Sequence, residues 1–180
     1  DAGWEELREQ RQARAVQLGI VPADSAMVTM SSTNDWDAYS AEEQRYHAKR
    51  MAVYAGMVDA MDHHIGRLID YLKSTGQYDN TIFIFTSDNG SEASGGDSPR
   101  HPLMQLALRV QGYNNDYDTL GLKGSFNTIG PSFASAAASP LAYYKFYAGE
   151  GGMRVPLIVA GASIPAEPRL SNAFAFVTDI

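Results

Sequence analysis

Two adjacent oxygen-bearing side chains, Asp88 and Asn89, directly follow an apolar segment that has the composition of a buried strand. Ligands of open α/β sheets bind where the chain leaves the carboxyl end of a strand. A carboxylate beside an amide oxygen suits a hard cation such as Ca²⁺ or Mg²⁺ better than zinc. Such a cation takes about six or more oxygens, so further ligands must come from elsewhere. The string Asp-Asn-Gly is also a common tight turn, and by itself it favours that simpler interpretation.

A second candidate for chemistry is Lys145, which precedes a glycine-rich run at residues 149–152 and a second apolar segment. Glycines let the backbone turn sharply, so the ammonium group could lie over a site. There it would balance the charge of a transferring sulfuryl or phosphoryl group. Taken alone, Lys145 fits an ordinary solvated lysine better. Arg154 lies between two glycines and the apolar segment, which favours a structural role.

The histidines give weaker signals. His101 lies in a loop rich in Gly, Ser and Pro, and could reach a substrate pocket as part of a lid. His47, His63 and His64 fall in one predicted helix. Because His63 and His64 are adjacent, they point to different sides of that helix and do not form a metal-binding pair. We interpret these three as surface or helix-packing residues.

The elements that position these residues alternate between helix and strand. Helical spacing of apolar residues predicts one helix over residues 4–18 and a long second helix over residues 40–75. Ser40 and Glu43 fit a capping box at the start of the second helix, and Gly76 fits its C-terminal cap. The apolar stripe of this long helix requires a sheet or other helices to cover it.

Two apolar segments predict strands. Residues 81–86 form a continuous run of β-formers, which is typical of a strand buried on both faces in a parallel sheet, and residues 155–160 predict a second strand. Residues 90–140 between them are rich in Gly, Ser, Asn, Asp and Pro, and only residues 103–110 have a locally ordered pattern. This composition predicts a long loop of the kind that is usually functional or disordered. The sequence therefore predicts an α/β fold with a mainly parallel sheet flanked by helices.

Composition limits the possible partners. The 180 residues are 44% hydrophobic, which is enough for one domain with a core. A net charge of −7 without a basic stripe disfavours nucleic acid, and no apolar run approaches the length of a membrane span. The chain has no cysteine, which excludes disulfides, thiolate zinc sites and cysteine nucleophiles. Because the chain lacks an initiator methionine and stops within the apolar pattern of residues 172–180, we expect residues 1–180 to be a single partial domain of a longer protein.

Four blocks of the sequence resemble, in this order, the sulfatase family within the alkaline-phosphatase-like superfamily. They are residues 54–67, 80–90, 130–145 and 151–156. Residues 3–11 also resemble bacterial arylsulfatases of the aryl-ester type. Each block alone is a weak signal, whereas the four together in this order are specific. One departure is Phe133, where the family usually has tryptophan.

This resemblance implies part of an alkaline-phosphatase-like sandwich that hydrolyses a small-molecule sulfate ester. It implies that Asp88 and Asn89 are two ligands of a calcium ion, and that Lys145 contacts the sulfate. The family's nucleophile is a formylglycine made from the first residue of Cys/Ser-x-Pro-x-Arg, a motif that is absent here. We therefore expect the nucleophile and the remaining calcium ligands upstream in the parent chain, and no activity from this chain alone. Family members are often periplasmic or secreted, so we expect such a location.

Two alternatives remain open at this point. A hydrolase of phosphate monoesters or diesters from the same superfamily would share the metal at the end of a strand, although many such enzymes use two metals with several Asp and His ligands. A non-catalytic binding domain would also lack a nucleophile. The motif upstream of this chain would distinguish an enzyme from a binding domain.

Overall fold

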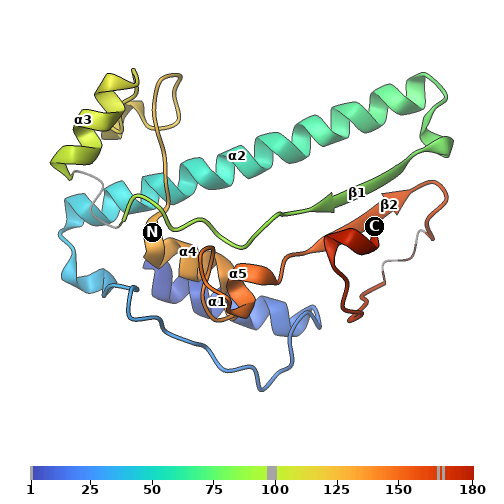
Figure 1. Ribbon diagram of the computed structural model, residues 1–180, viewed down its shortest axis with the longest axis horizontal. Helices are drawn as coiled ribbons and strands as arrows, with labels where there is room; N and C mark the ends of the chain where they lie inside the picture. The colour runs from blue at the N-terminus through green and yellow to red at the C-terminus, as the bar shows by residue number, and fades with distance from the viewer. Residues whose placement is uncertain (1, 97–100, 166, 168) are drawn as a thin grey trace.

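The computed structural model describes residues 2–96, 101–165, 167 and 169–180. Five α-helices and two β-strands in these residues are joined by long connections and short 3₁₀ helices (Figure 1). In chain order they are α1 (Gly3–Gln17), η1 (Trp36–Ala38), α2 (Ala41–Ser74), η2 (Tyr78–Asn80), β1 (Ile82–Thr86), α3 (Pro102–Val110), η3 (Tyr117–Thr119), α4 (Gly130–Ala138), α5 (Glu150–Met153), β2 (Leu157–Gly161) and η4 (Val177–Asp179). Both predicted helices and both predicted strands are present at the expected positions.

The long helix α2 begins at the predicted capping box. The backbone N–H of Ser40 donates to Glu43 Oε2 at 2.9 Å, and the backbone N–H of Glu43 donates to Ser40 Oγ at 3.3 Å. These two bonds satisfy N–H groups that would otherwise have no partner in the first turn. The helix ends at Ser74, and Gly76 follows with a φ of +69°, a conformation that glycine adopts at little cost.

The core forms where α1 packs against α4. Trp4 of α1 is fully buried. The centroid of its ring lies 4.7 Å from that of Trp36 and 5.3 Å from that of Phe133, and both pairs are edge to face. Its indole N–H donates to the carbonyl of Asn34 at 2.8 Å, so the polar end of the side chain is satisfied as well. The buried apolar residues of this Trp4 core are Trp4, Met30, Trp36, Ile129, Phe133, Ala134, Ala136 and Tyr144.

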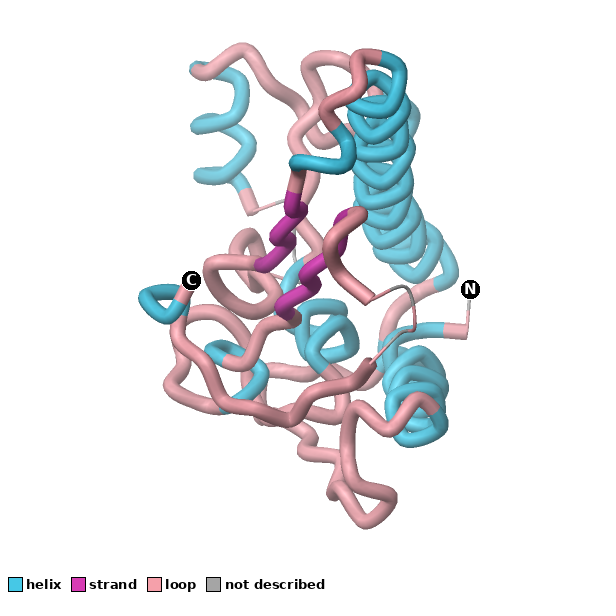
Figure 2. Tube along the Cα trace, turned by 90° about the vertical axis from the view of Figure 1, so that its right-hand side faces the viewer, coloured by secondary structure: helices cyan, strands magenta, loops and turns pink. Residues whose placement is uncertain are grey.

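The predicted parallel sheet is wrong for the residues that the structure describes. Strands β1 and β2 form a two-stranded antiparallel ribbon, with Ile82 opposite Gly161 and Thr86 opposite Leu157. Figure 2 shows the two strands side by side. A continuous apolar run predicts burial and strand formation, but it does not encode the direction of the partner strand. The direction is decided by the connection that brings β2 back along β1.

The predicted burial of β1 on both faces is also wrong for these residues. Ile84 of β1 is 48% exposed and Ile158 of β2 is 54% exposed. Part of the apolar stripe of α2 is exposed too, including Met57, Val58, Met61 and Leu68. A strand buries its apolar faces only against another layer, and no described element covers either face of this ribbon completely.

The segment predicted as a long loop, residues 90–140, contains two α-helices: α3 coincides with the expected ordered stretch at residues 103–110, whereas α4 was not predicted. Each has proline in its first turn, where the missing N–H costs no hydrogen bond. Helix α3 is amphipathic, whereas α4 supplies Phe133 and its neighbours to the Trp4 core. Residues 97–100 of this segment lie outside the described part of the chain. None of the described helices is both long enough and apolar enough to cross a membrane.

Candidate functional site

The turn that ends β1 presents the two predicted metal ligands. The hydroxyl of Ser87 donates to the carbonyl of Asn89 at 2.7 Å, which closes the turn. Asp88 is exposed and Asn89 is half-buried. Within the described chain, no hydrogen bond or ion pair engages the side chain of either residue, so their oxygens are free to meet a cation.

The chain segments that carry the turn and the lysine are held together by three contacts. The N–H of Gly90 donates to the carbonyl of Gly152 at 2.8 Å, and the N–H of Lys145 donates to the carbonyl of Ser91 at 3.0 Å. Lys145 Nζ lies 2.5 Å from Glu92 Oε2. We call this pair of segments, residues 90–92 and 145–152, the clasp.

The clasp requires glycine at position 90. A Cβ at this position would lie 1.8 Å from the carbonyl oxygen of Gly151, far inside van der Waals contact. The two backbones approach this closely because residue 90 carries no side chain. The predicted turn string Asp-Asn-Gly therefore has a tertiary role, since its glycine docks the turn onto the segment that follows Lys145.

The ammonium group of Lys145 interacts electrostatically with two acidic residues, Glu92 and Asp88. The hydrogen bond to Glu92 raises the pKa of Lys145; partial burial opposes this rise, and the charges of Glu92 and Asp88 add to it. Lys145 therefore stays an ammonium at neutral pH. The structure thus brings together Asp88 and Lys145, two of the predicted site residues, although they belong to distant parts of the sequence.

The backbone around Lys145 is held in an uncommon conformation. Tyr143 and Phe146 have φ values of 71° and 81°, in the left-handed region that costs a side-chain-bearing residue about 1–2 kcal/mol. Tyr144 between them is buried, and its hydroxyl lies 2.6 Å from Ser32 Oγ. This contact of the Tyr144 side chain fixes the loop on the Trp4 core, and the next residue, Lys145, pairs with Glu92 in the clasp.

The other candidates from the sequence lie elsewhere or serve the fold. His101 is exposed at the start of α3, and no hydrogen bond or ion pair joins it to Asp88, Asn89 or Lys145 in the described chain. Arg154 lies 3.7 Å from Glu150 in an exposed ion pair, consistent with its structural interpretation. His47 is buried in the packing against Trp4, whereas the adjacent pair on α2 is exposed.

Sequence reasoning missed Glu92. This carboxylate accepts the N–H of Ser94 at Oε1, at 2.8 Å, and pairs with Lys145 at Oε2. Its sequence neighbourhood is a Gly/Ser-rich loop, where an acidic residue is normally a solvated one. The sequence indicated a role for Glu92 only through its position three residues after Asn89, which keeps it close to the turn.

Asp88 and Asn89 fit a hard cation in donor type but not in number. Both offer oxygen, which Ca²⁺ prefers. Among the described residues, no group of three or more His, Cys, Asp or Glu side chains could hold a metal ion. Glu92 is close by, but both its oxygens are already engaged. This chain therefore offers two oxygen ligands of such a site, and the remaining ligands are not provided by its described residues.

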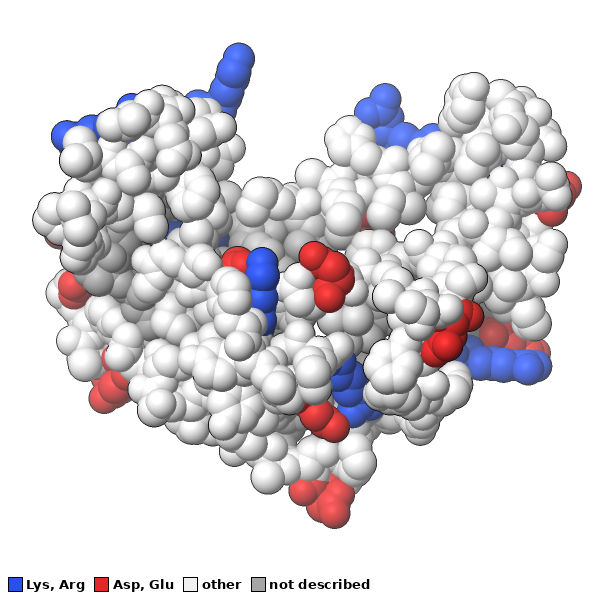
Figure 3. Space-filling view, in the orientation of Figure 1, with Lys and Arg blue, Asp and Glu red and all other residues white. Residues whose placement is uncertain are grey.

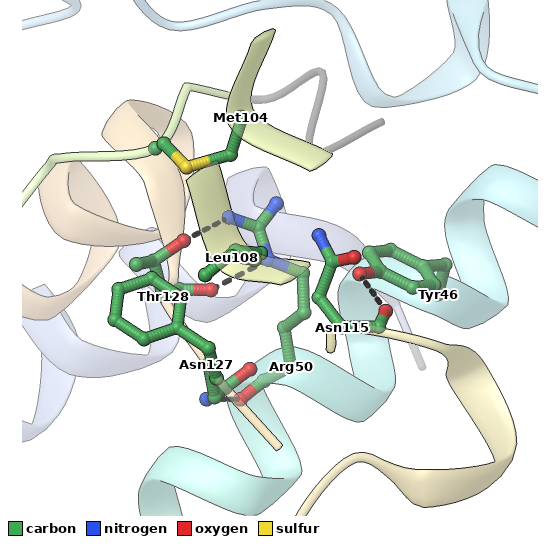
Figure 4. A pocket seen from close by; sticks show the side chains of 9 residues that line it. Tyr46, Arg50, Met104, Leu108, Asn115, Asn127 and Thr128 are labelled. Carbon is green, nitrogen blue, oxygen red and sulfur yellow. Dashed lines mark hydrogen bonds between the residues drawn. The ribbon is translucent and has the colours of Figure 1, made fainter. Parts of the chain in front are cut away.

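A separate small cavity lies between α2 and α3 and is unsuited to a substrate (Figure 4). It measures about 10 Å³, which is space for a single water molecule. In Figure 4 the guanidinium of Arg50 lies beside Thr128 and donates to its carbonyl at 2.5 Å and to its hydroxyl at 2.8 Å. Neither Asp88 nor Lys145 lines this cavity, so it is separate from the candidate site.

Comparison with known proteins assigns the family. Residues 21–180 match the model of the sulfatase family. The chain belongs to this family. As a sulfatase, it is 37% identical over 180 residues to an uncharacterized sulfatase of Schizosaccharomyces pombe, covering 99% of this chain and 32% of that protein. It is 33% identical over 184 residues to an arylsulfatase of Klebsiella aerogenes, covering 100% of this chain and 38% of that protein.

The sulfatase chain spans about a third of the length of these curated relatives. A shorter match, 46% identical over 62 residues, joins 34% of the chain to 11% of a multifunctional alkaline phosphatase superfamily protein of Trinickia caryophylli. The family match includes the turn after β1 and the clasp, so the candidate site lies inside the region that defines this sulfatase.

Proposed function

We propose that this chain is part of a calcium-dependent arylsulfatase, in which Asp88 and Asn89 bind the metal and Lys145 binds the sulfate group of the substrate. The observation that carries the proposal is the clasp, which holds the ammonium of Lys145 beside the turn of Asp88. The likeness to an arylsulfatase over the full length of the chain supports the choice of substrate class.

Charge explains why a cation and a lysine act together at this site. The chain carries a net charge of −7, and on the face shown in Figure 3 its basic side chains are scattered rather than gathered. A sulfate ester is an anion, so only local positive charge attracts it. Asp88 and Asn89 would hold calcium, which when bound supplies Lewis-acid neutralisation of sulfate oxygens. Lys145 donates N–H bonds to the same oxygens and stabilises charge that develops as the ester bond breaks.

These 180 residues do not contain the motif from which the formylglycine nucleophile is made. Formylglycine requires a Cys or Ser in Cys/Ser-x-Pro-x-Arg, and the 180 residues contain no Cys and no Ser-x-Pro-x-Arg. We therefore place the nucleophile and the remaining calcium ligands in the rest of the parent protein. A turnover rate close to zero is expected for the 180-residue chain alone, and ordinary enzyme rates from it would contradict this division of the site.

The test uses the full-length protein that contains this chain. Replacing Lys145 by Met should lower kcat/KM for nitrophenyl sulfate by roughly 10²–10³-fold, the usual loss when one charge-stabilising group is removed. Asp88→Ala should weaken calcium binding measured by calorimetry. Lys123→Met, at an exposed lysine outside the clasp, is the matched control and should change kcat/KM less than twofold. Unchanged activity in Lys145→Met would overturn the proposal.

A phosphate ester hydrolase is the second candidate, supported by the match to the alkaline phosphatase superfamily protein. Sulfate and phosphate monoesters share tetrahedral geometry and negative charge, so the clasp suits both. The ratio of kcat/KM for nitrophenyl sulfate to that for nitrophenyl phosphate decides between them. An arylsulfatase should favour the sulfate by at least about a hundredfold, since a site matched to one transition state discriminates at that scale. We also propose a periplasmic or secreted location, which cell fractionation tests.

A further inference from the structure

The carboxylate of Glu92 makes two contacts: one oxygen pairs with Lys145, and the other accepts a hydrogen bond from the backbone. Its Oε1 accepts the backbone N–H of Ser94 at 2.8 Å, and its Oε2 lies 2.5 Å from Lys145 Nζ. The two side chains are 41% and 35% exposed, so the pair lies at the surface of the clasp. The carboxylate is thus fixed by the backbone of its own loop before it meets the lysine.

We propose that Glu92 is the positioning residue for Lys145, and that it sets where the ammonium meets the sulfate. This inference rests on the proposed function. A lysine ends a flexible four-carbon stem, and the backbone bond from Lys145 to Ser91 leaves the position of Nζ undetermined. A carboxylate tied to the backbone supplies the missing restraint. An ammonium has three N–H groups, so two remain for substrate oxygens when one is bound to Glu92.

The charge of Glu92 gives this role a distinctive kinetic signature. A carboxylate next to the site repels an anionic substrate, so by charge alone it weakens binding. By orientation it strengthens the contact that Lys145 makes in the transition state. Removal of the charge should therefore lower kcat while KM stays constant or falls. A residue that only stabilised the fold would not separate the two constants in this direction.

The experiment compares Glu92→Gln, Glu92→Asp, Lys145→Met and the double variant Glu92→Gln/Lys145→Met. Each is made in the full-length protein and assayed with nitrophenyl sulfate in the presence of calcium. Glu92→Gln should lower kcat by about 10- to 100-fold, because a displacement of about 1 Å at a reacting group has effects of this size. Glu92→Asp keeps the charge on a shorter stem and should recover part of the loss. In a Lys145→Met background, Glu92→Gln should have no further effect on kcat, since the group it positions is gone.

Glu6→Gln is the matched control. Glu6 accepts an exposed hydrogen bond from the side chain of Gln10 on α1, outside the clasp, so its loss should leave kcat within twofold of the native value. The midpoint of thermal unfolding is measured for every variant. A drop of only a few degrees in Glu92→Gln agrees with an exposed pair.

Three outcomes would overturn the inference about Glu92. The first is a kcat within twofold of native in Glu92→Gln while Lys145→Met shows its expected loss of activity, which leaves the proposed function intact. The second is the same fold-loss from Glu92→Gln in the native and Lys145→Met backgrounds, which shows that Glu92 acts without the lysine. The third is an increased KM in Glu92→Gln at unchanged kcat. Native activity in Lys145→Met would instead overturn the proposed function itself.

Discussion

The Trp4 core and the β1–β2 ribbon differ in how completely they bury apolar side chains. In the core, Trp4 is fully buried among aromatic rings, and its indole N–H is satisfied. In the ribbon, Ile84 and Ile158 remain about half exposed although the strands pair over five residues. Strand pairing satisfies backbone hydrogen bonds, but only a second layer buries side chains. The core is therefore stabilised mainly by side-chain packing, whereas the ribbon is stabilised mainly by backbone hydrogen bonds.

This difference divides the candidate site in two. Lys145 follows Tyr144, which is buried in the Trp4 core, so the lysine side of the site is anchored by packing. Asp88 and Asn89 follow β1, so the metal side depends on the ribbon and on the clasp. The clasp connects the two sides directly. Three substitutions test how far this division holds.

The largest effect is expected from Trp4→Ala. Removing a fully buried tryptophan leaves a cavity and should cost about 3–5 kcal/mol of unfolding free energy, measured by urea titration of the 180-residue chain. Ile158→Ala is the control in the ribbon and should cost less than about 1 kcal/mol, because its side chain is already half exposed. Equal costs at the two positions would show that the ribbon is packed as tightly as the core.

A smaller effect is expected from Gly90→Ala in the clasp. The new Cβ would meet the carbonyl of Gly151, so the two segments must separate, at a cost of about 1–3 kcal/mol. Gly56→Ala is a control of opposite sign: nothing lies within 4 Å of its Cβ, and alanine in a helix should stabilise by about 0.5–1 kcal/mol. Both are measured by urea unfolding. Stabilisation by Gly90→Ala would show that the clasp is open in solution.

The smallest effect concerns pH and the ion pair of the clasp. Partial burial raises the pKa of Glu92, but hydrogen bonds from Lys145 and Ser94 and the charge of Lys145 outweigh it, so the pKa is lowered. Because the pKa of Glu92 is lower in the folded chain than in the unfolded chain, where it is near 4.5, the ion pair stabilises the fold at pH values above the unfolded-state pKa. This stabilisation is lost as the pH falls through the folded-state pKa. Because the pair is exposed, its contribution should stay below about 1 kcal/mol.

The measurement compares the unfolding free energy of the native chain with that of Glu92→Gln between pH 7 and pH 3. The difference should be constant near neutral pH and should disappear in acid. A difference that grew as the pH fell would mean that Glu92 is protonated more easily in the folded chain than in the unfolded chain, against the ion pair with Lys145.

The local elements were predictable from the sequence because their signals are local. The capping box at Ser40, the glycine after α2 and the apolar runs of both strands involve residues a few positions apart, and the structure confirms them. The family was likewise predictable, because four blocks in order carry it, and the family match confirms it. The roles of Asp88, Asn89 and Lys145 were inferred from the same resemblance and stay predictions.

Only the tertiary structure decided how the distant parts meet. The antiparallel direction of the strands, their exposure and the packing of helix α4 against α1 depend on which elements pack together, and apolar periodicity alone does not contain that information. Glu92 illustrates the reason most directly. Along the chain it is one acidic residue in a polar loop, and it gains a role only because Gly90 lets the loop approach the backbone that carries Lys145. Residue types and local spacing are written in the sequence, whereas a contact between distant segments exists only once the chain has folded.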